Sequence, residues 1–404
     1  TKKKKTPPVP GIESPPATMA KAPRAGGATP PSGGLPEDIV VWEILVRLPQ
    51  KSLLRCRAVC RAWRGATSTR DFALAHHGRQ PSLPIVGGFE LGGARHDYLF
   101  SFDHRAADGQ LQPVARFDDS FSTEISFDGL LILSNNGTTG TCFSVCNPAT
   151  RQHAPLRQLS GFRLLGMYAH RPTGEYRLLL HRALDLLPRD QIACHVYVLG
   201  SDQPPRFICC LETAASTDFN TPALVRDSLH WYPVHHHRKP RQRLFGSNLV
   251  IVFDTISESF RQMCAPDVPL CSYIFEMDVT LGIYSCDNAR RTVNTWVLQD
   301  YESEVWEWEW EYNIALPVIE IRDQLGWFND NWDTSVVSVG GEVLLLVSHG
   351  GWMFYVDIDG ELVDKIHRDG QCLYACKFQL KQTLVPHTFF TALEGYAVNA
   401  LPFV

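Results

Sequence analysis

The apolar positions of residues 35–78 recur at helical spacing. They predict a first helix whose apolar side chains belong to Ile39, Val40, Ile44, Leu45 and Leu48. Pro36 suits the first turn of this helix because its missing N–H would be unbonded there, and Pro49 ends the helix. A short second helix is expected from Lys51. The next apolar positions predict a third helix through Val59, Cys60, Trp63 and Ala66.

After Pro81 the pattern changes to short apolar runs separated by turn residues, which is typical of strands. A repeat becomes visible when the predicted hairpins are aligned. One apolar run ends at Asn147 in "FSVCNPATRQ" and another ends at Asp254 in "VIVFDTISES". An Asn or Asp side chain at such a point can accept hydrogen bonds from the turn backbone, which explains the residue choice. Weaker copies of the pattern end at Asp103, Gly200, Asp300 and Asp357.

The spacing of these six positions predicts the fold of residues 81–404. The intervals are 44, 53, 54, 46 and 57 residues, which suits propeller blades of about four strands. Further strand-like runs begin at Asp128, Glu175, Asp227, Thr280 and Glu342. We therefore expect a mainly-β, propeller-like domain of about six repeats, so that the fold class is α+β multidomain. The "KFQL" or "LPFV" run could close the ring on the first blade. Two β-sandwiches in tandem are the alternative.

Composition and charge limit the classes of partner. The 404 residues carry 38 Lys and Arg against 43 Asp and Glu, a net charge of −5, which argues against general nucleic-acid binding. No run approaches the roughly 18 apolar residues of a membrane span, and no secretory signal is visible. We expect no membrane partner and a cytoplasmic and/or nuclear location. Residues 1–34 are rich in Pro, Gly and Ala and are expected to form a disordered tail.

The sequence contains no pattern typical of an enzyme or a metal site. The twelve cysteines do not form CxxC pairs at zinc-like spacing. His235, His236 and His237 on an extended chain would point alternately and would not converge on a metal. The GxSxG, HExxH and P-loop motifs are absent. We therefore expect no catalytic residue, no metal ligand and no cofactor.

The segment "VWEWEWEYN" is the most unusual of the predicted strands. If it is extended, Trp306, Trp308, Trp310 and Tyr312 share one face and the glutamates lie on the other. The aromatic face is either buried between blades or forms a recognition surface. Aromatic residues in the loop-like run "GWFNDNWD" add to the second interpretation, because loops on a rigid scaffold commonly carry binding residues. The candidate target-binding residues are Trp306, Trp308, Trp310, Trp327, Phe328 and Trp332.

The three predicted helices span about 45 residues, which is close to the lower limit for independent folding. Their apolar residues point in more than one direction. Part of this apolar surface therefore either packs onto the β domain or binds another chain. Trp63, flanked by small apolar groups, is a plausible anchor for such an interface.

The run "LPEDIVVWEILVRLPQKSLLRCRAVCRAW", residues 35–63, resembles an F-box, the motif by which substrate receptors join cullin-based SCF ubiquitin ligases. It departs from the family pattern at residues 40–42, which include an extra bulky residue, and at Arg61, where many members have Lys. The runs "SFDGLLILSNN", "FSVCNPATRQHAPL", "TWVLQDYES" and "TLVPHTFF" are similar to F-box-associated domains of large plant receptor families. The resemblance implies an F-box at residues 35–80 and a propeller-like substrate-recognition domain at residues 81–404.

The same resemblance implies partners. The F-box would bind a small Skp-family linker that bridges to a cullin, and the β domain would hold a target protein for ubiquitination by other subunits. The chain would then be a non-catalytic receptor subunit. The alternatives are a sugar- or small-ligand-binding propeller or an enzyme whose F-box only regulates abundance, and a receptor that binds the linker without delivering a target. The implied linker contacts are Leu35, Pro36, Ile39, Ile44, Leu45, Leu48, Pro49, Leu53, Val59, Cys60 and Trp63.

Overall fold

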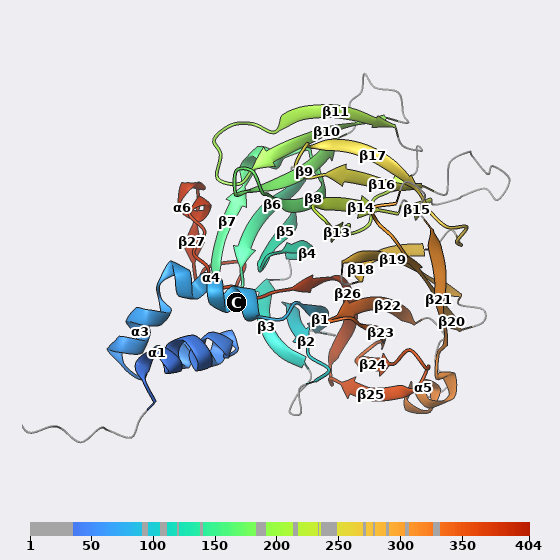
Figure 1. Cartoon of the computed structure of the whole chain (residues 1–404), viewed down its shortest axis with the longest axis horizontal. Helices are drawn as coiled ribbons and strands as arrows, with labels where there is room; N and C mark the ends of the chain where they lie inside the picture. The colour runs from blue at the N-terminus through green and yellow to red at the C-terminus, as the bar shows by residue number, and fades with distance from the viewer. Residues whose placement is uncertain are drawn as a thin grey trace, which may run out of the picture.

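A helical part is followed by a ring of β-sheets in the computed structural model of this chain (Figure 1). The structure describes residues 35–90, 96–105, 111–118, 121–137, 140–182, 191–212, 217–232, 234–235, 249–269, 272–277, 279–287, 291–303, 307–325 and 332–404. The expected N-terminal tail lies outside these residues, as do Trp306, Trp327 and Phe328. Among the described helices, none has both the length and the apolar character needed to cross a membrane.

The helical part contains one more helix than predicted. Its elements are α1 (Glu37–Ile39), η1 (Val40–Ile44), η2 (Leu45–Arg47), α2 (Gln50–Cys56), α3 (Arg61–Thr67) and α4 (Arg70–Arg79). Pro49 ends the first helical path as predicted, and α2 begins immediately after it. The predicted start of the third helix is wrong. Cys60 is extended and caps α3, its Sγ accepting a hydrogen bond from the Trp63 N–H at 3.4 Å, so Val59 lies before the helix.

Six four-stranded blades follow, each running from an innermost to an outermost strand. Blade 1 consists of β26 (Gln371–Leu380), β1 (Leu83–Glu90), β2 (His96–Phe102) and β3 (Leu111–Asp118). Blade 2 consists of β4 (Phe121–Phe127), β5 (Leu130–Gly137), β6 (Gly140–Asn147) and β7 (Gln152–Leu156), with β27 (Ala397–Val398) added outside β7. Blade 3 consists of β8 (Arg163–His170), β9 (Glu175–Arg182), β10 (Gln191–Val198) and β11 (Arg206–Glu212).

The other three blades have the same order. Blade 4 consists of β13 (Ala223–Val225), β14 (Ser228–Trp231), β16 (Leu249–Asp254) and β17 (Ser259–Cys264). Blade 5 consists of β18 (Ser272–Met277), β19 (Thr280–Asp287), β20 (Thr292–Leu298) and β21 (Trp308–Ala315). Blade 6 consists of β22 (Asp333–Val339), β23 (Glu342–His349), β24 (Trp352–Val356) and β25 (Leu362–His367). Smaller elements are β12 (Thr217–Asp218), β15 (Val234–His235), η3 (Arg157–Leu159), α5 (Val318–Leu325) and α6 (Phe389–Ala392).

The repeat predicted from the sequence is confirmed. All six marked positions lie at the turn between the third and fourth strands of a blade. The Asn147 side chain accepts hydrogen bonds from the backbone N–H groups of Ala149 and Thr150 at 3.0 and 3.3 Å. The Asp254 side chain accepts hydrogen bonds from the backbone N–H groups of Ile256 and Ser257 in the same way. The side chains of Asp103, Asp300 and Asp357 also accept hydrogen bonds from the backbone of their own turns. The five additional predicted runs form the second strands of blades 2 to 6.

The ring is closed by the last long strand of the chain. β26 pairs antiparallel with β1, with Leu380 opposite Leu83. The "KFQL" run therefore closes the first blade, which confirms one of the two predicted ways of closing the ring. The "LPFV" run also contacts this blade, because Phe403 forms an isolated bridge with Phe117 of β3. The alternative of two tandem β-sandwiches is therefore wrong, and the fold is a six-bladed β-propeller.

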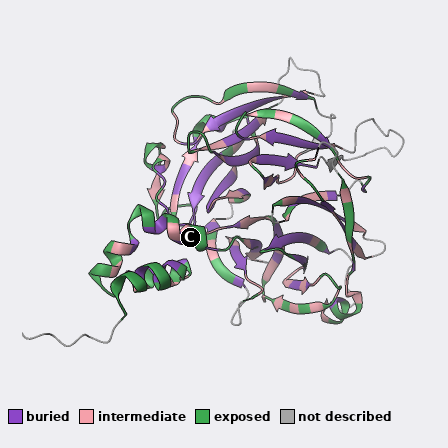
Figure 2. Ribbon diagram, viewed as in Figure 1, coloured by how far each residue is buried: buried purple, intermediate pink, exposed green. Residues whose placement is uncertain are grey.

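Apolar packing between neighbouring blades forms the core of the propeller. Each interface in the ring has its own buried cluster. The central strands of the blades are accordingly mostly buried, whereas outermost strands such as β21 and β25 are largely exposed or half-buried (Figure 2). In the cluster between blades 3 and 4, for example, Tyr168 and Trp231 are fully buried. A blade that is exposed to water on such a face is not stable alone, so the sheets depend on their neighbours.

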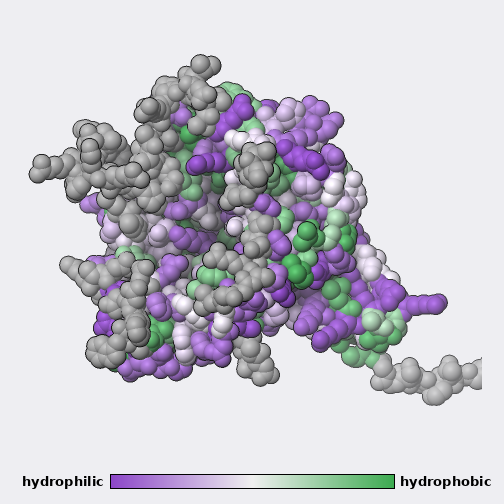
Figure 3. Space-filling model, turned by 180° about the vertical axis from the view of Figure 1, so that it is seen from behind, coloured by the Kyte–Doolittle hydropathy of each residue, from purple (hydrophilic) through white to green (hydrophobic). Residues whose placement is uncertain are grey.

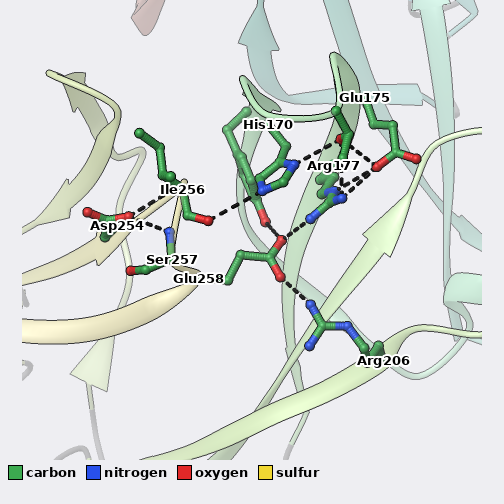
Figure 4. Close-up of polar contacts among 10 residues, drawn as sticks. His170, Glu175, Arg177, Arg206, Asp254, Ile256, Ser257 and Glu258 are labelled. Atoms are coloured by element: carbon green, nitrogen blue, oxygen red, sulfur yellow. Dashed lines mark hydrogen bonds and ion pairs between the residues drawn. The ribbon is translucent and has the colours of Figure 1, made fainter.

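A charged network reinforces the interface between blades 3 and 4 (Figure 4). Glu258, in the third–fourth turn of blade 4, accepts hydrogen bonds from Tyr168 Oη at 2.7 Å and Arg177 at 2.6 Å, and it also pairs with Arg206. The Glu258 side chain is only 10% exposed. Burial alone would raise the pKa of Glu258, but these hydrogen bonds and the two guanidinium charges hold that pKa below its usual value.

We expect Glu258→Gln to lower the free energy of unfolding by about 3 kcal/mol at pH 7, because it removes one partner of a buried ion pair. Since the pKa of Glu258 is lower in the folded than in the unfolded state, the carboxylate stabilises the protein fully above the unfolded pKa. This stabilisation is lost as the pH falls through the folded pKa. The difference in melting temperature between the wild type and Glu258→Gln should therefore shrink below about pH 4.

The matched control is Glu302→Gln. Glu302 pairs with Arg226 across the next blade interface, but its side chain is 74% exposed. Such an exposed pair contributes about 0.5 kcal/mol. Thermal unfolding of the three proteins between about pH 7 and pH 3 makes the comparison. Equal losses for the two variants at pH 7 would show that burial of Glu258 does not strengthen the network.

Candidate interaction surfaces

The helices have a small apolar core that they do not complete alone. The buried members from the helices are Val41, Leu45, Val46, Leu53 and Phe72. The remaining buried member is Leu384, which comes from the segment after β26. Two of the predicted linker contacts, Leu45 and Leu53, are therefore core residues with exposed fractions of 2% and 0%. Leu48 and Trp63 are half-buried against the same core.

The other predicted contacts remain at the surface of the helical part. They are Leu35, Pro36, Ile39, Ile44, Pro49, Val59 and Cys60. The sequence analysis missed three further exposed apolar residues, which are Trp42, Leu54 and Leu74. Trp42 could have been found, since it is the bulky residue by which the run departs from the family pattern. Figures 2 and 3 show this exposure, with apolar side chains on the surface of the helical part at the lower right of Figure 3.

We call the residues Leu35, Ile39, Trp42, Ile44, Leu54, Val59 and Leu74 the exposed apolar set. Val59 is the most exposed of them at 68%, and Trp42 is 41% exposed. The helical part therefore packs onto the β domain through Leu384 and still leaves large apolar groups in water. Such groups, when several occur on one small element, are typical of a protein–protein interface.

Polar contacts fix the bend between the first helical path and α2. The buried ring of His76 donates a hydrogen bond from Nε2 to the carbonyl of Leu48 at 2.8 Å, and Gln80 donates to the same carbonyl at 3.3 Å. Burial lowers the pKa of His76. Arg57 binds the side chain and the carbonyl of Thr67 at 3.1 and 2.5 Å. The backbone around Pro49 is thus held by α4, and the end of α2 is held by α3.

The chain segment 381–388 joins the helices to the propeller. Gln50 of α2 donates a side-chain hydrogen bond to the carbonyl of Gln382 at 2.9 Å. On the other side of the segment, Asn147 of blade 2 donates to the carbonyl of Thr383 at 3.2 Å. Leu384 directly follows Gln382 and Thr383 and fills the helical core. The sequence analysis used the run "TLVPHTFF" only for its resemblance to F-box-associated domains. Its residues do not alternate between apolar and polar as in a strand, and this was the available signal that the run has a role other than pairing in a blade.

A second contact joins α4 to blade 2. His77 Nε2 lies 2.5 Å from Asp128 Oδ1, and Tyr176 donates its hydroxyl to the other carboxylate oxygen at 2.5 Å. Burial alone would raise the pKa of Asp128, but these hydrogen bonds hold it below its usual value. Next to it, Gly129 has φ +84°, and a Cβ there would lie 2.5 Å from the carbonyl of Lys381. Only glycine lets segment 381–388 approach this turn so closely.

The helices therefore contact one face of the propeller. This face carries the first–second turn at Asp128 and the third–fourth turn at Ala149 of blade 2. Because the strands of a blade are antiparallel, the second–third loops and the connections between blades lie on the opposite face. That opposite face is free of contact with the helices in the described part of the chain.

The predicted target-binding aromatic residues fall into different environments. Trp310 is 59% exposed on β21. Trp308 is half-buried and donates its Nε1–H to the carbonyl of Cys264 at 3.0 Å. Trp332 is only 8% exposed, with the Arg291 guanidinium 4.9 Å from its ring centre, so it is a core residue between blades 5 and 6.

The expectation of a shared aromatic face is wrong for Tyr312, while Trp308 and Trp310 do share a face. The register pairs Thr295 with Tyr312 but Trp296 with Trp310, so Glu311 is the extra residue of a β-bulge. One extra residue reverses the alternation of side chains. Trp308 accordingly packs into the cluster between blades 4 and 5, whereas Tyr312 packs into the cluster between blades 5 and 6.

The described part of the chain has free cysteines and no cluster of potential metal ligands. The cysteines that the structure describes are all free thiols. Burial raises the pKa of Cys376 to about 12. No group of three or more His, Cys, Asp or Glu side chains in the described ranges is arranged to hold a metal ion.

Comparison with known proteins identifies both parts. Residues 99–356 match the family model "F-box associated beta propeller domain", and residues 33–73 match the model "F-box-like". The chain is 24% identical to F-box protein At5g49610 of Arabidopsis thaliana, over 68% of this chain and 78% of the relative. It is 22% identical to F-box protein At1g30790 of the same plant, over 83% of this chain and 90% of the relative.

We expect Leu384→Ala to loosen the helices from the propeller. Leu384 is 6% exposed in the helical core, and removing a buried leucine side chain costs about 2–5 kcal/mol. Amide hydrogen exchange of α2 and α4 should become faster by the corresponding factor, while exchange in β23 stays slow. Val404→Ala is the control, because Val404 is 50% exposed. Unchanged protection of α2 in Leu384→Ala would contradict a structural role for this residue.

Proposed function

This chain belongs to the plant F-box proteins with an F-box-associated β-propeller domain, and from that premise we propose that it is the substrate-recognition adaptor of an SCF ubiquitin ligase. The pair of domains supports an SCF adaptor role in general. In the specific proposal, the F-box binds a Skp-family linker, the linker bridges to a cullin, and the propeller holds a target protein. The complex acts in the cytoplasm and/or the nucleus.

The exposed apolar set is the observation that carries this proposal. The helical part already has a packed core, completed by Leu384, and none of these residues is a buried member of it. Trp42, Ile39 and Val59 nevertheless stay in water. Burying about seven such side chains against a partner gives a favourable free energy of roughly 25 cal/mol for each Å² of apolar surface.

The junction between the two parts supports the same role. Leu384, Gln50 and His77 make contacts that hold the helices against blade 2. A receptor that works by proximity gains from such a fixed arrangement, because the effective concentration of a bound target near the ubiquitin-charged enzyme depends on geometry. The proposed role needs no cofactor and no catalytic residue in this chain, since ubiquitin transfer belongs to other subunits.

We expect the double variant Ile39→Asp/Val59→Asp to bind the purified Skp-family linker at least about thirtyfold more weakly than the wild type. Both side chains are exposed, at 42% and 68%, so charges at these positions leave the fold intact but would be buried without a partner in the complex. Isothermal titration calorimetry or a pull-down with the purified linker measures the effect.

Ile319→Asp is the matched control for this experiment. Ile319 is 73% exposed on α5 of the propeller, so the same substitution there should leave linker binding unchanged. Equal melting temperatures for the three proteins would show that folding is preserved. Wild-type affinity in the double variant would rule out the exposed apolar set as the linker surface.

The adaptor role also predicts which proteins accumulate on the receptor. In plant cells, the double variant should retain target proteins that the wild type delivers for degradation. Quantitative mass spectrometry of both captured receptors should show the same targets, enriched on the variant. A proteasome inhibitor should remove most of that difference. Identical amounts on both receptors without inhibitor would argue against target delivery.

A further inference from the structure

The negative charge of the propeller is confined to two of its blades. Residues 272–367, which form blades 5 and 6, contain 18 Asp and Glu but only 4 Lys and Arg. The rest of the propeller sequence, residues 81–271 and 368–404, contains 20 of each kind. The propeller therefore has one acidic sector and is otherwise balanced. A sector of one sign creates a potential that attracts partners of the opposite sign.

The outermost strand of this sector presents a tryptophan to water. β21 pairs with β20 on one side, and its other edge has no strand partner among the described residues. Trp310 on this strand is 59% exposed, which makes it the most exposed of the described tryptophans. Glu309 and Glu311 on either side of it are also exposed.

The β-bulge changes what this strand presents. Without it, Trp310 and Tyr312 would point to the same face of the sheet. Because Glu311 is the extra residue, the alternation reverses between Trp310 and Tyr312. Tyr312 therefore faces the opposite side of the sheet from Trp310, and its hydroxyl hydrogen-bonds the Glu311 carboxylate beside it. An exposed indole ring on a strand that also carries exposed carboxylates is suited to a cationic segment, in which one Lys or Arg side chain can lie over the ring and others can pair with the carboxylates.

A purely protective role does not explain this edge. Charged residues on an edge strand prevent unwanted pairing with other chains, and glutamates alone would do so. An exposed tryptophan works against such protection, since it adds a large apolar surface to the edge. Nucleic acid is also a poor partner, because the phosphates would be repelled by the acidic sector.

We propose that the outer edge of β21 is a docking surface for a lysine- and arginine-rich extended segment of the target protein. One cationic side chain of that segment lies over Trp310, and others pair with Glu309 and Glu311. The free strand edge allows the segment to add to blade 5 through its backbone. This proposal rests on the adaptor function proposed above, and it names the chemistry of the target.

The test uses the full chain in complex with the purified Skp-family linker. The probes are a fluorescent peptide about as long as β21 that alternates Lys or Arg with Thr or Val, and the same peptide with Gln at every basic position. Fluorescence anisotropy measures binding at several salt concentrations. We expect the complex to bind the basic peptide with an affinity that falls as salt rises, and to bind the Gln peptide at least about tenfold more weakly.

Peptide binding by variants of β21 tests whether the basic peptide binds at this strand. Trp310→Ala should weaken binding of the basic peptide about tenfold, and Glu309→Gln/Glu311→Gln should weaken it and reduce its salt dependence. Strand β11 of blade 3 supplies matched controls in the charge-balanced sector. There Phe207 is 53% exposed and Glu212 is also exposed. Phe207→Ala and Glu212→Gln should bind like the wild type.

Each outcome has one meaning. Unchanged binding by Trp310→Ala, or equal losses in the β11 controls, would overturn the docking surface, as would self-association of the complex through β21 in place of peptide binding. Linker binding is measured in the same preparations. A complex that forms with the linker but shows no β21-dependent peptide binding refutes only this inference. A wild-type chain that fails to bind the linker refutes the proposed adaptor function.

Discussion

The apolar contact between neighbouring blades is the interaction on which the rest of the structure depends. Each of the six interfaces is filled by its own buried cluster, so every blade needs a neighbour on both sides. A row of blades would leave two faces in water, and only a closed ring removes them. Closure requires that β26 pairs with β1, which brings residues 371–380 back to the start of the propeller.

That closure explains where the helical part lies. After β26 the chain emerges on the face beneath blade 2, next to the segment that enters β1. Residues 381–388 are therefore available to both parts, and Leu384 fills the core that the helices cannot complete alone. Gln50 then adds a hydrogen bond to Gln382 of this segment, and His77 contacts Asp128 in a turn of blade 2. The orientation of the F-box on the propeller is thus a consequence of the way the ring is closed.

Local signals in the sequence predicted much of this fold. The turn residues between the third and fourth strands and the apolar second strands are determined by nearby residues. The turns were marked in all six blades, with Gly200 in place of Asn or Asp in blade 3, and the second strands were found in blades 2 to 6. The bulge at Glu311 was not predictable, because an extra residue in β21 is defined only by its pairing with β20. The burial of Leu45 depends on Leu384, more than 300 residues away. For the same reason, the sequence could not separate core residues from exposed residues within the F-box run.

The use of the last long strand for closure also has a consequence for biosynthesis. A ribosome releases residues 371–384 only after the helices and five complete blades have been made. Until then β1 lacks its inner neighbour and the helices lack the leucine that completes their core. A polypeptide that ends before residue 371 would have an unpaired edge on β1 and an incomplete helical core. Chaperones and proteases can recognise such exposed strand edges and apolar surface. Synthesis of residues 371–384 is thereby a condition both for the closed ring and for a complete helical core.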